Sequence, residues 1–596
     1  MKVSETKDRL FKGGAFLTED ISSEDIITPE DFTEEQKMLA KTTEEFIDKE
    51  IVPKLEELEN QNFDISVDLL KKAGELGLLG VDVPEAYGGL GLDKISSAFI
   101  TEKFSQAGGF SITHGAHVGI GSLPIVFFGN KQQKEKYLPK LASGELIAAY
   151  ALTEATSGSD ALGAKSTAVL NEAGTHYILN GEKQFITNSA FADVFIVYAK
   201  IDGKHFSTFI VEREFPGVST GIEEKKMGIK SSSTRTLILD DAEVPVENVL
   251  GEKGKGHKIA FNILNVGRYK LAIGSVGGAK EALEVATKYV KERKQFNTQI
   301  SDFPLTREKI GTMASKIYAN ESAVYRTVGL FEQRMGSLTD EQLKDGREIA
   351  AAIAEYQIEC SMNKYTATEV LDYVVDEAVQ MHGGNGFIQE YVVERMYRDS
   401  RINRIFEGTN EINRLLVPGT LLKKAMKGEL PLLQQAQSLQ EELVMKMPEE
   451  VGTGTLEQEK YLLKNAKKIV LFAAGMATQK YMQNIEDEQE ILVNLADMVS
   501  EVYNMESAIL RTEKAINQSG EGSNRQKLLY TQVYVQEAFS RMEADAKETL
   551  IAVEEGDTLR MMLASLRKLT RHTPINVIQK KREIAAKIIV EEKYMV

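Results

Sequence analysis

Apolar residues recur at helical spacing over about the first 150 residues of the chain. Thr33 and Gln36 form a capping-box pattern at the start of one helix, and the apolar stripe that follows ends at Pro53. Further helical patterns continue to about residue 147. The spacing therefore predicts an N-terminal helical domain over residues 30–148.

The spacing changes to strand-like alternation between about residues 150 and 250. The strand-like runs lie at residues 177–179, 194–199, 207–211 and 236–239. Asn-Gly, Asp-Gly and Pro-Gly turn signals bound these runs, which is typical of hairpins. Residues 149–255 are therefore predicted to form a small antiparallel β domain.

Helical spacing returns in the second half of the chain. One apolar stripe begins at Ala279 and extends to Arg293. We predict a helical bundle over residues 256–425 and an additional helical domain over residues 430–596, which contains a polar stretch around residues 449–455. The pattern as a whole indicates a mainly α-helical protein with a central β domain.

Composition and charge narrow the class of protein. The 596 residues include 42% hydrophobic and 27% charged side chains, which is ordinary for a folded soluble protein. The formal net charge of −17 disfavours nucleic-acid binding, so we expect no nucleic-acid partner. Cys360 is the only cysteine, which excludes a disulfide or a cysteine-based metal site within one chain, and we expect no metal.

The N-terminus and the apolar runs bear on location. Residues 1–20 contain four acidic residues and no apolar core, so neither a secretory signal nor a transit peptide is expected. The longest apolar run, Ile469 to Ala477, has nine residues, whereas a membrane span needs about 20. We therefore expect a soluble, cytoplasmic protein of bacterial origin.

The chain ends in a basic segment. From Leu566 onward there are eight Lys or Arg residues and three Glu residues, in an otherwise acidic protein. The favoured interpretation is a helix with a solvated face that packs on its own acidic subunit. Weak contact of the C-terminal helices with a membrane surface is the alternative.

Two segments at the edge of the β domain carry groups suited to a ring cofactor. The first, Tyr150 to Asp160, includes Thr153 and Ser159, which could contact a phosphate or the rim of a ring. In the second, Phe185 and Thr187 are two residues apart and should share one side of a strand. A plain turn and ordinary strand packing are the respective alternatives.

Arg293 and a Gly-rich segment are candidate ligand contacts. An arginine on an apolar stripe needs an anion, which is either a Glu across the bundle or a diphosphate. The segment Gln380 to Gly386 ends a predicted helix, and its glycines permit close approach of a ligand. His382 in that segment is interpreted as a satisfied core histidine rather than a catalyst.

Glu407 is the candidate general base. It lies in a predicted break between two helices, after Ile405 and Phe406 and before Gly408 and Thr409. A carboxylate that projects from such a loop into an apolar cavity has its pKa raised by desolvation, as a base that works near neutrality requires. A helix-capping Glu is the alternative interpretation.

Taken in order, these segments resemble the acyl-CoA dehydrogenase family, flavoenzymes that introduce the 2,3-double bond into acyl-CoA thioesters. The likeness runs from about residue 30 to residue 425. The matching motifs are Tyr150 to Asp160, Phe185 to Asn188, Leu264 to Arg268, Arg293 to Phe296, Gln380 to Phe387 and Arg404 to Thr409. The segment Phe110 to Gly121, the stretch Tyr137 to Glu145 and the C-terminal helices resemble the very-long-chain branch.

The resemblance implies a fold and a cofactor. The fold is a helical domain, a β-barrel and a four-helix bundle, followed here by an extra C-terminal helical domain. FAD would lie between barrel and bundle and across a homodimer interface. Its contacts would be Tyr150, Thr153, Ser159, Phe185, Ile186, Thr187, Arg293, Phe296, Gln380, Gly383, Gly384, Thr409, Asn410 and Glu411, partly in the neighbouring subunit.

The resemblance also implies the reaction. Glu407 would remove the α-proton, while its main-chain N–H and a flavin ribityl hydroxyl would hold the thioester oxygen. The acyl-CoA would contact Ser159, Asn265, Gly267, Arg268, Phe406, Glu407 and Gly408. The predicted function is FAD-dependent 2,3-dehydrogenation of long-chain or very-long-chain acyl-CoA to trans-2-enoyl-CoA, the first step of fatty acid β-oxidation. The electrons would pass to an electron-transfer flavoprotein.

Some positions depart from the family pattern. Phe185 stands where the family commonly has Trp, so an aromatic face is kept. Ala155 and Asn297 stand where Pro and Gly are usual, which leaves the local loop shapes open without removing a chemical group.

Several alternatives stay open at the level of sequence. The small residues Gly115, Ala116 and Gly119 either leave a deep acyl channel or permit tight helix packing. An acyl-CoA oxidase, in which oxygen reaches the reduced flavin, is one alternative function. An assembly or scaffold protein that retains the dehydrogenase fold is another.

Overall fold

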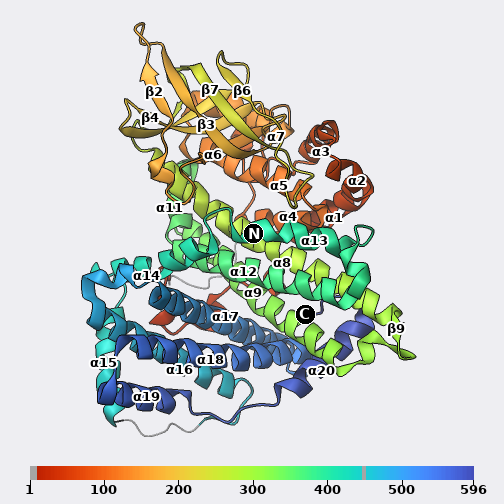
Figure 1. The fold of residues 1–596 in the computed structure, drawn as a ribbon, viewed down its shortest axis with the longest axis vertical. Coiled ribbons are helices and arrows are strands. Elements are labelled where there is room, and N and C mark those ends of the chain that lie inside the picture. Colours follow the sequence, from red (N-terminus) through yellow and green to blue (C-terminus); the bar gives the residue numbers. More distant parts are fainter. Residues whose placement is uncertain (1–9, 446–450) are drawn as a thin grey trace.

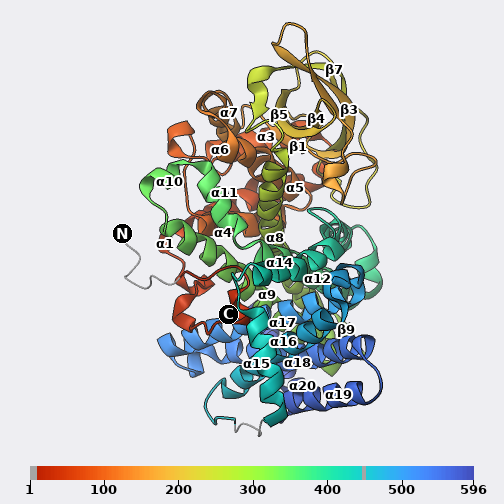
Figure 2. The ribbon, with the colours of Figure 1, turned by 90° about the vertical axis from the view of Figure 1, so that its left-hand side faces the viewer.

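The protein is described by a computed structural model that covers residues 10–445 and 451–596. Glu5 and Asp8 of the acidic N-terminal stretch, and the beginning of the polar stretch 449–455, lie outside the described residues. The β domain lies at one end of the long axis and the C-terminal helices lie at the other (Figure 1). The helical bundle lies between them in both views (Figures 1 and 2).

The N-terminal part is helical. Its helices are α1 (Glu34–Phe46), α2 (Leu55–Glu59), α3 (Phe63–Glu75), α4 (Lys94–Phe104), α5 (Phe110–Gly115), α6 (Leu123–Phe128) and α7 (Lys131–Ser143). The capping box of α1 is confirmed, because the Gln36 amide N–H donates to Thr33 Oγ1 at 3.2 Å and Thr33 N–H donates to Gln36 Oε1 at 2.9 Å. The two side chains thus accept hydrogen bonds from two backbone N–H groups that would otherwise lack partners at the start of the helix.

Helices α5 and α6 are joined by the π-helical turn η8 (Ala116–Gly121). The combined segment, Phe110–Phe128, is long and apolar enough to cross a membrane by length and composition alone. However, 72% of its apolar window is buried inside the protein, and core helices of folded proteins pass the same test. Its burial indicates a core position.

The β domain contains one eight-stranded sheet and takes in the predicted strand-like runs. Its strands are β1 (Ala148–Ala151), β2 (Thr167–Leu170), β3 (His176–Thr187), β4 (Val194–Ile201), β5 (His205–Glu212), β6 (Val218–Thr220), β7 (Thr234–Pro245) and β8 (Val249–Leu250). The strand order is β6-β7-β3-β2-β4-β5-β8, and β1 pairs with β4.

The prediction of a purely antiparallel sheet is wrong in part, because β4 is parallel to both β1 and β2. Parallel neighbours need a crossover connection, and the strands between them in sequence supply it. The hairpin turn signals identified the antiparallel pairs only, since a crossover leaves no comparable short-range signal.

The central bundle is built from long helices. They are α8 (Gly256–Glu292), α9 (Pro304–Gly336), α10 (Asp340–Lys344), α11 (Gly346–Ala354), α12 (Gln357–His382), α13 (Val392–Ser400) and α14 (Asn410–Met426). A small two-stranded sheet of β9 (Lys294–Gln295) and β10 (Thr298–Gln299) follows α8. Ala279, Leu283 and Val290 of the predicted stripe are buried in α8. The mainly helical fold class with a central β domain is confirmed.

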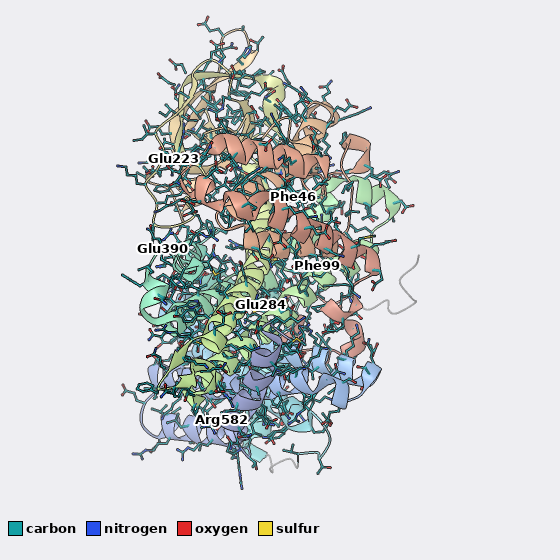
Figure 3. The ribbon with its side chains drawn as sticks, turned by 90° about the vertical axis from the view of Figure 1, so that its right-hand side faces the viewer. Phe46, Phe99, Glu223, Glu284, Glu390 and Arg582 are labelled. Atoms are coloured by element: carbon teal, nitrogen blue, oxygen red, sulfur yellow. The ribbon has the colours of Figure 1, made fainter. Side chains whose placement is uncertain are left out.

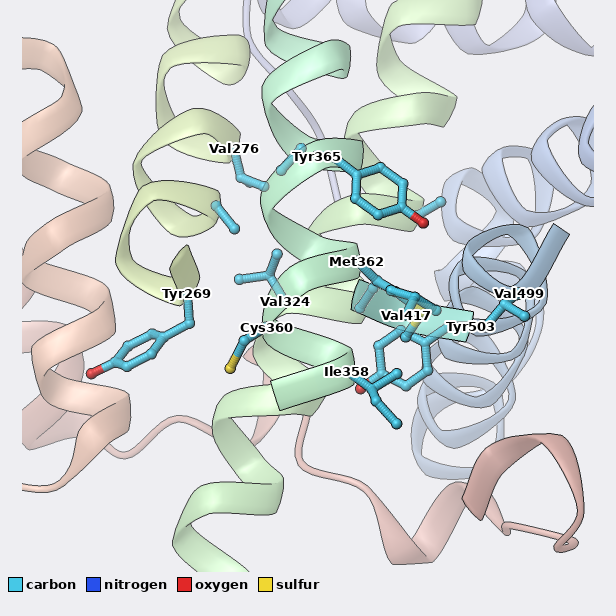
Figure 4. Close-up of a cluster of buried hydrophobic side chains, with 14 of the residues drawn as sticks. Tyr269, Val276, Val324, Ile358, Cys360, Met362, Tyr365, Val417, Val499 and Tyr503 are labelled. Carbon is cyan, nitrogen blue, oxygen red and sulfur yellow. The ribbon is translucent and has the colours of Figure 1, made fainter. Parts of the chain in front are cut away.

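The C-terminal part adds a second helical layer. Its helices are α15 (Leu432–Met445), α16 (Glu457–Tyr481), α17 (Gln489–Ser519), α18 (Arg525–Val553), α19 (Gly556–Thr570) and α20 (Val577–Glu591). Helix α17 packs on the bundle, and Tyr503 and Val499 of α17 lie beside Met362 of α12 and Val417 of α14 (Figure 4).

Buried ion pairs join this layer to the bundle. The Arg511 guanidinium of α17 contacts Glu30 at 2.8 Å and Glu321 of α9 at 2.7 Å. Arg326 of α9 contacts Glu506 of α17 at 2.8 Å, and both side chains are almost fully buried. These pairs are largely shielded from water, so removal of one partner takes away much of the charge that compensates the other.

The basic C-terminal segment packs on its own subunit, in agreement with the favoured interpretation. Lys581 of α20 is buried and pairs with Glu308 of α9 at 2.9 Å and with Glu537 of α18 at 2.6 Å. Figure 3 shows Arg582 on the same helix, at the end of the molecule remote from the N-terminal helices that carry Phe46 and Phe99. The acidic partners of Lys581 thus belong to the same subunit.

The buried pairs of Arg511 predict a large effect of charge removal. Replacement of Arg511 by Leu leaves Glu321 with Lys280 as its cationic partner and leaves Glu30 with Lys527 at 3.5 Å. Both carboxylates lose a close compensating charge, so the free energy of unfolding should fall by about 3 kcal/mol. The midpoint of urea unfolding measures this change. Arg560→Leu is the control, because Arg560 and its partner Asp557 are exposed, and it should change the stability by less than about 1 kcal/mol. Equal midpoints for the two variants would contradict the inference that the buried pairs of Arg511 stabilise the fold more than the exposed pair of Arg560 does.

Candidate active site

Glu407 lies in a short non-helical connection between η13 (Arg401–Arg404) and α14, as predicted. Its backbone φ is 57°, in the left-handed region that non-glycine residues rarely occupy. Thr409 caps α14 by accepting a hydrogen bond from the Ile412 N–H at 3.3 Å. The cap is therefore Thr409, and the alternative of a helix-capping Glu407 is excluded.

The Glu407 carboxyl is buried against α8. Its Oε2 is buried and has no hydrogen-bond partner among the described residues. A Cβ on Gly267 would lie 2.3 Å from this oxygen, so only glycine leaves room for the carboxyl. Burial raises the Glu407 pKa to about 7, against the opposing charges of Arg268 and Lys364. A carboxyl in this state accepts a proton near neutral pH.

The Glu407 loop is held by groups from three helices, and from α14 the Asn413 side-chain amide donates to the Gly408 carbonyl at 2.8 Å. Arg268 of α8 donates to the Glu407 carbonyl at 3.4 Å and to Asn265 Oδ1 at 3.1 Å. Lys364 of α12 donates to the Gly408 carbonyl at 2.8 Å and to Asn410 Oδ1 at 2.7 Å. These contacts fix the strained backbone that aims the carboxyl.

Lys364 is a site residue that the sequence analysis missed. Burial lowers its pKa to about 7, although the charge of Glu407 opposes this shift. A lysine within the otherwise apolar face of a predicted helix was the available signal, because such a charge needs partners when buried.

A cavity of about 220 Å³ extends from Glu407 along α8. Glu407, Phe406, Thr187 and Gly267 line one end. Gly115, Ala116 and Gly119 line it from the segment around η8, and a Cβ on Gly115 would have no atom within 4 Å. Of the two interpretations of these small residues, the structure supports an open channel.

The first polar segment lies close to this end of the cavity. Tyr150 is half-buried, its hydroxyl is buried and has no hydrogen-bond partner in the described part of the chain, and the Glu407 charge acts on it. The segment is anchored by the ion pair of Glu154 with Lys183 at 2.6 Å. Thr153 is half-buried and Ser159 is exposed, so both are open to a ligand.

The second segment departs from the predicted geometry. Phe185 has φ of 60° and lies at a register shift between β3 and β7, so the regular strand alternation is wrong at this point. Thr187 lines the cavity, Ile186 is buried, and the Phe185 side chain is 58% exposed. The bulge re-aims these side chains in a way that alternation does not anticipate.

Arg293 is exposed rather than buried, which corrects the expectation drawn from the apolar stripe. Helix α8 ends at Glu292, and Arg293 follows as its C-terminal cap. Phe296 is 90% exposed with φ of 53°. Gln380, Gly383 and Gly384 are also exposed.

These groups form a second set, remote from Glu407. Arg293 lies 26 residues beyond Gly267 on α8, a distance of about 39 Å along the helix axis. His382 stacks on Tyr289 at 4.0 Å and bonds to the Ala378 carbonyl at 2.7 Å, which places the Gly-rich segment beside this end of α8 and confirms a satisfied core histidine. One subunit therefore does not bring the two sets of predicted FAD contacts together.

The remaining predicted residues surround the Glu407 loop. Asn265 and Arg268 are buried on α8, Thr409 and Gly408 are half-buried, and Glu411 is exposed in the first turn of α14.

The residues present fit a flavin dinucleotide. Across residues 10–445 and 451–596, the buried Tyr150 hydroxyl and Glu407 Oε2 find no hydrogen-bond partner, as expected for groups that face a ligand. At the far end of α8, a Cβ on Gly383 or Gly384 would meet no atom within 4 Å. Arg293 has no ion pair among the described residues and could take a diphosphate.

Comparison with known proteins identifies the family. Models of the acyl-CoA dehydrogenase N-terminal domain and middle domain match residues 33–145 and 149–242. Two models of the acyl-CoA dehydrogenase C-terminal domain match residues 254–422 and 465–568, and the second lies in the C-terminal helices.

Individual relatives agree with these matches. A probable acyl-CoA dehydrogenase of Bacillus subtilis (strain 168) is 71% identical over 98% of each chain. The mitochondrial very long-chain specific acyl-CoA dehydrogenase of Rattus norvegicus is 36% identical over 78% of this chain and 72% of its own. The crystal structure of an acyl-CoA dehydrogenase complexed with FAD from Bacillus anthracis is 70% identical, with a TM-score of 0.98 over 98% of this chain and 100% of that one. The chain therefore belongs to the acyl-CoA dehydrogenase family and is an FAD-dependent acyl-CoA dehydrogenase.

Proposed function

We propose that the protein converts long-chain or very-long-chain acyl-CoA to trans-2-enoyl-CoA, the first step of fatty acid β-oxidation. The observation that carries this proposal is the Glu407 carboxyl, with its raised pKa, at one end of a long cavity beside α8. FAD, when bound, supplies the acceptor for the electrons that leave the substrate.

Glu407 removes the α-proton of the thioester in this proposal. The α-carbon is a far weaker acid than an ordinary carboxylic acid. The raised pKa of Glu407 makes the difference between the pKa values of the α-carbon and the base smaller. Charge that develops on the thioester oxygen needs donors, and the main-chain N–H of Glu407 makes no hydrogen bond in the described part of the chain. One such donor contributes roughly 3 kcal/mol to an oxyanion.

The shape of the cavity supports a long acyl chain. Its α8 wall runs from Gly267 to Glu281, 14 residues or about 21 Å along the axis. Since carbon–carbon bonds are about 1.5 Å long, a chain of more than a dozen carbons can lie along this wall. Gly274 lies midway, and a Cβ there would meet no atom within 4 Å.

The separation of the FAD contacts supports a homodimer. The set at the far end of α8 would serve the flavin of a second copy of the chain. Two exposed aromatic side chains lie there, Phe296 at 90% exposure and Phe387 at 85%. Large apolar groups exposed in this way mark interaction surfaces.

An electron-transfer flavoprotein is the proposed electron acceptor, in the cytoplasm of a bacterium. A 36% identical relative from Acetobacterium woodii is named as a subunit of a caffeyl-CoA reductase-Etf complex. A solved structure with 38% identity and a TM-score of 0.60 is described as an electron transferring flavoprotein of Acidaminococcus fermentans. Peroxide formation during turnover would instead indicate the oxidase alternative.

Replacement of Glu407 by Gln tests the base directly. The variant should fold and bind FAD, but its rate of flavin reduction by palmitoyl-CoA should fall by about 10²-fold or more, because the amide accepts no proton. Anaerobic bleaching of the flavin measures the rate. Glu172→Gln, an exposed change in the turn after β2, should leave the rate unchanged. Full-rate bleaching in the Glu407 variant would exclude Glu407 as the base.

The raised pKa of Glu407 predicts the pH dependence. Only the ionised carboxylate accepts a proton, so kcat/KM for palmitoyl-CoA should rise with pH and level off above a midpoint near 7. A profile of kcat/KM between pH 5 and 9 measures the midpoint, with flavin retention checked at each pH. A rise complete below pH 5, or a fall across this range, would contradict the assignment.

Gly274→Leu tests the path of the acyl chain. A leucine at this position fills the middle of the cavity, so kcat/KM for palmitoyl-CoA should fall by about 10²-fold, while butyryl-CoA, which ends before Gly274, should be little affected. The matched control is Gly336→Leu, since Gly336 is exposed at the end of α9 and also has open space around it. Equal losses for both substrates would indicate misfolding or a different path.

A further inference from the structure

The cavity beside α8 carries ionisable side chains near each of its two ends. Glu407 and Thr187 mark the first end. The remaining lining comprises glycines, the apolar residues Phe104, Ile112, Val118, Leu271, Leu371, Val375 and Met396, and polar side chains that include Ser111, His114, Lys270 and Ser275. The far end carries Glu281 of α8, Arg395 of α13 and Gln106 of the turn after α4. The mechanism proposed above uses none of these three polar side chains.

Among the described residues, the side chains of Glu281, Arg395 and Gln106 make no hydrogen bond and no ion pair. Burial raises the pKa of Glu281 to about 7, with the charge of Arg395 opposing the shift. The Arg395 guanidinium is placed by Gly108, where a Cβ would lie 3.6 Å from its Cζ. All three side chains are half-buried, so a ligand in the cavity can reach polar groups that no other described residue pairs.

The polar side chains at the far end of the cavity favour some terminal groups of an acyl chain over others. A methyl group displaces water and leaves the three polar side chains unpaired, which is unfavourable. A carboxylate would face Glu281 and also Asp399, which lines the same cavity. A hydroxyl can donate to Glu281 and accept from Arg395 or Gln106 at the same time.

We propose that the far end of the cavity recognises a hydroxyl group at the end of a long acyl chain, with Glu281 as a specificity-determining residue. This inference rests on the proposed function, because the acyl chain must lie along α8. The site would favour ω-hydroxyacyl-CoA over the plain acyl-CoA of the same length. The chemistry at the α and β carbons is unchanged.

The length of the channel fixes which hydroxyacyl chain fits. Glu281 lies about 21 Å along α8 from Gly267. Since each bond of about 1.5 Å advances an extended zigzag chain by about 1.3 Å, this distance suits a chain of about 16 carbons. The chain of 10-hydroxydecanoyl-CoA is six carbons shorter, so its hydroxyl cannot reach Glu281. The preference for a terminal hydroxyl should therefore be lost at the shorter length.

The test compares four substrates on the FAD-loaded enzyme: palmitoyl-CoA, 16-hydroxypalmitoyl-CoA, decanoyl-CoA and 10-hydroxydecanoyl-CoA. We expect kcat/KM to be about tenfold higher for 16-hydroxypalmitoyl-CoA than for palmitoyl-CoA, and no higher for 10-hydroxydecanoyl-CoA than for decanoyl-CoA. Glu281→Leu should abolish the preference for 16-hydroxypalmitoyl-CoA and raise kcat/KM for palmitoyl-CoA. Glu292→Leu, an exposed change at the end of the same helix, should preserve that preference.

The outcomes separate this inference from the proposed function. An enzyme that turns over palmitoyl-CoA without preference for its hydroxylated form, or whose preference survives Glu281→Leu, would overturn the recognition site alone. An enzyme that binds FAD but reduces it with none of the four substrates would overturn the proposed function. If Glu281→Leu fails to fold, Arg395→Met provides the same test, because it removes the opposing donor.

Discussion

The structure depends on the contact between the Glu407 carboxyl and Gly267. The carboxyl is forced into this place by a left-handed backbone at Glu407, and the contact exists only because Gly267 has no side chain. The resulting desolvation raises the pKa of Glu407, although Arg268 and Lys364 stand close enough to oppose it. Desolvation and strain are both costs to the fold, and the contacts of the loop with α8, α12 and α14 offset them.

Helix α8 supplies several of the features that surround that contact. It supplies Gly267 beside the base, the glycine-lined wall of the cavity, and at its other end the exposed Arg293. The C-terminal helices support the same bundle from behind, through α17 and its buried ion pairs with α9. A mainly apolar tube is thus held between rigid helices. This suits a reaction whose substrate is long and whose base must stay out of water.

Much of this could be predicted from sequence, because the deciding signals are local. The α1 capping box, the strand-like runs and the break at Glu407 each follow from a few neighbouring residues. Other features depend on contacts through space. The parallel pairs of β4, the bulge at Phe185 and the exposure of Arg293 leave no short-range signal in the sequence that would have predicted them. Assignment of the FAD contacts required the resemblance to a family, since spacing alone left each segment with an ordinary packing alternative.

The central claim concerns the protonation of one side chain, and infrared spectroscopy measures it most directly. The carboxyl C=O band present in the wild type and absent in Glu407→Gln reports the protonated form of Glu407 alone. The account predicts that this band titrates with a midpoint near pH 7 in the FAD-loaded enzyme. A midpoint near the ordinary value of about 4.3 would show that the carboxyl is solvated, and would contradict the account.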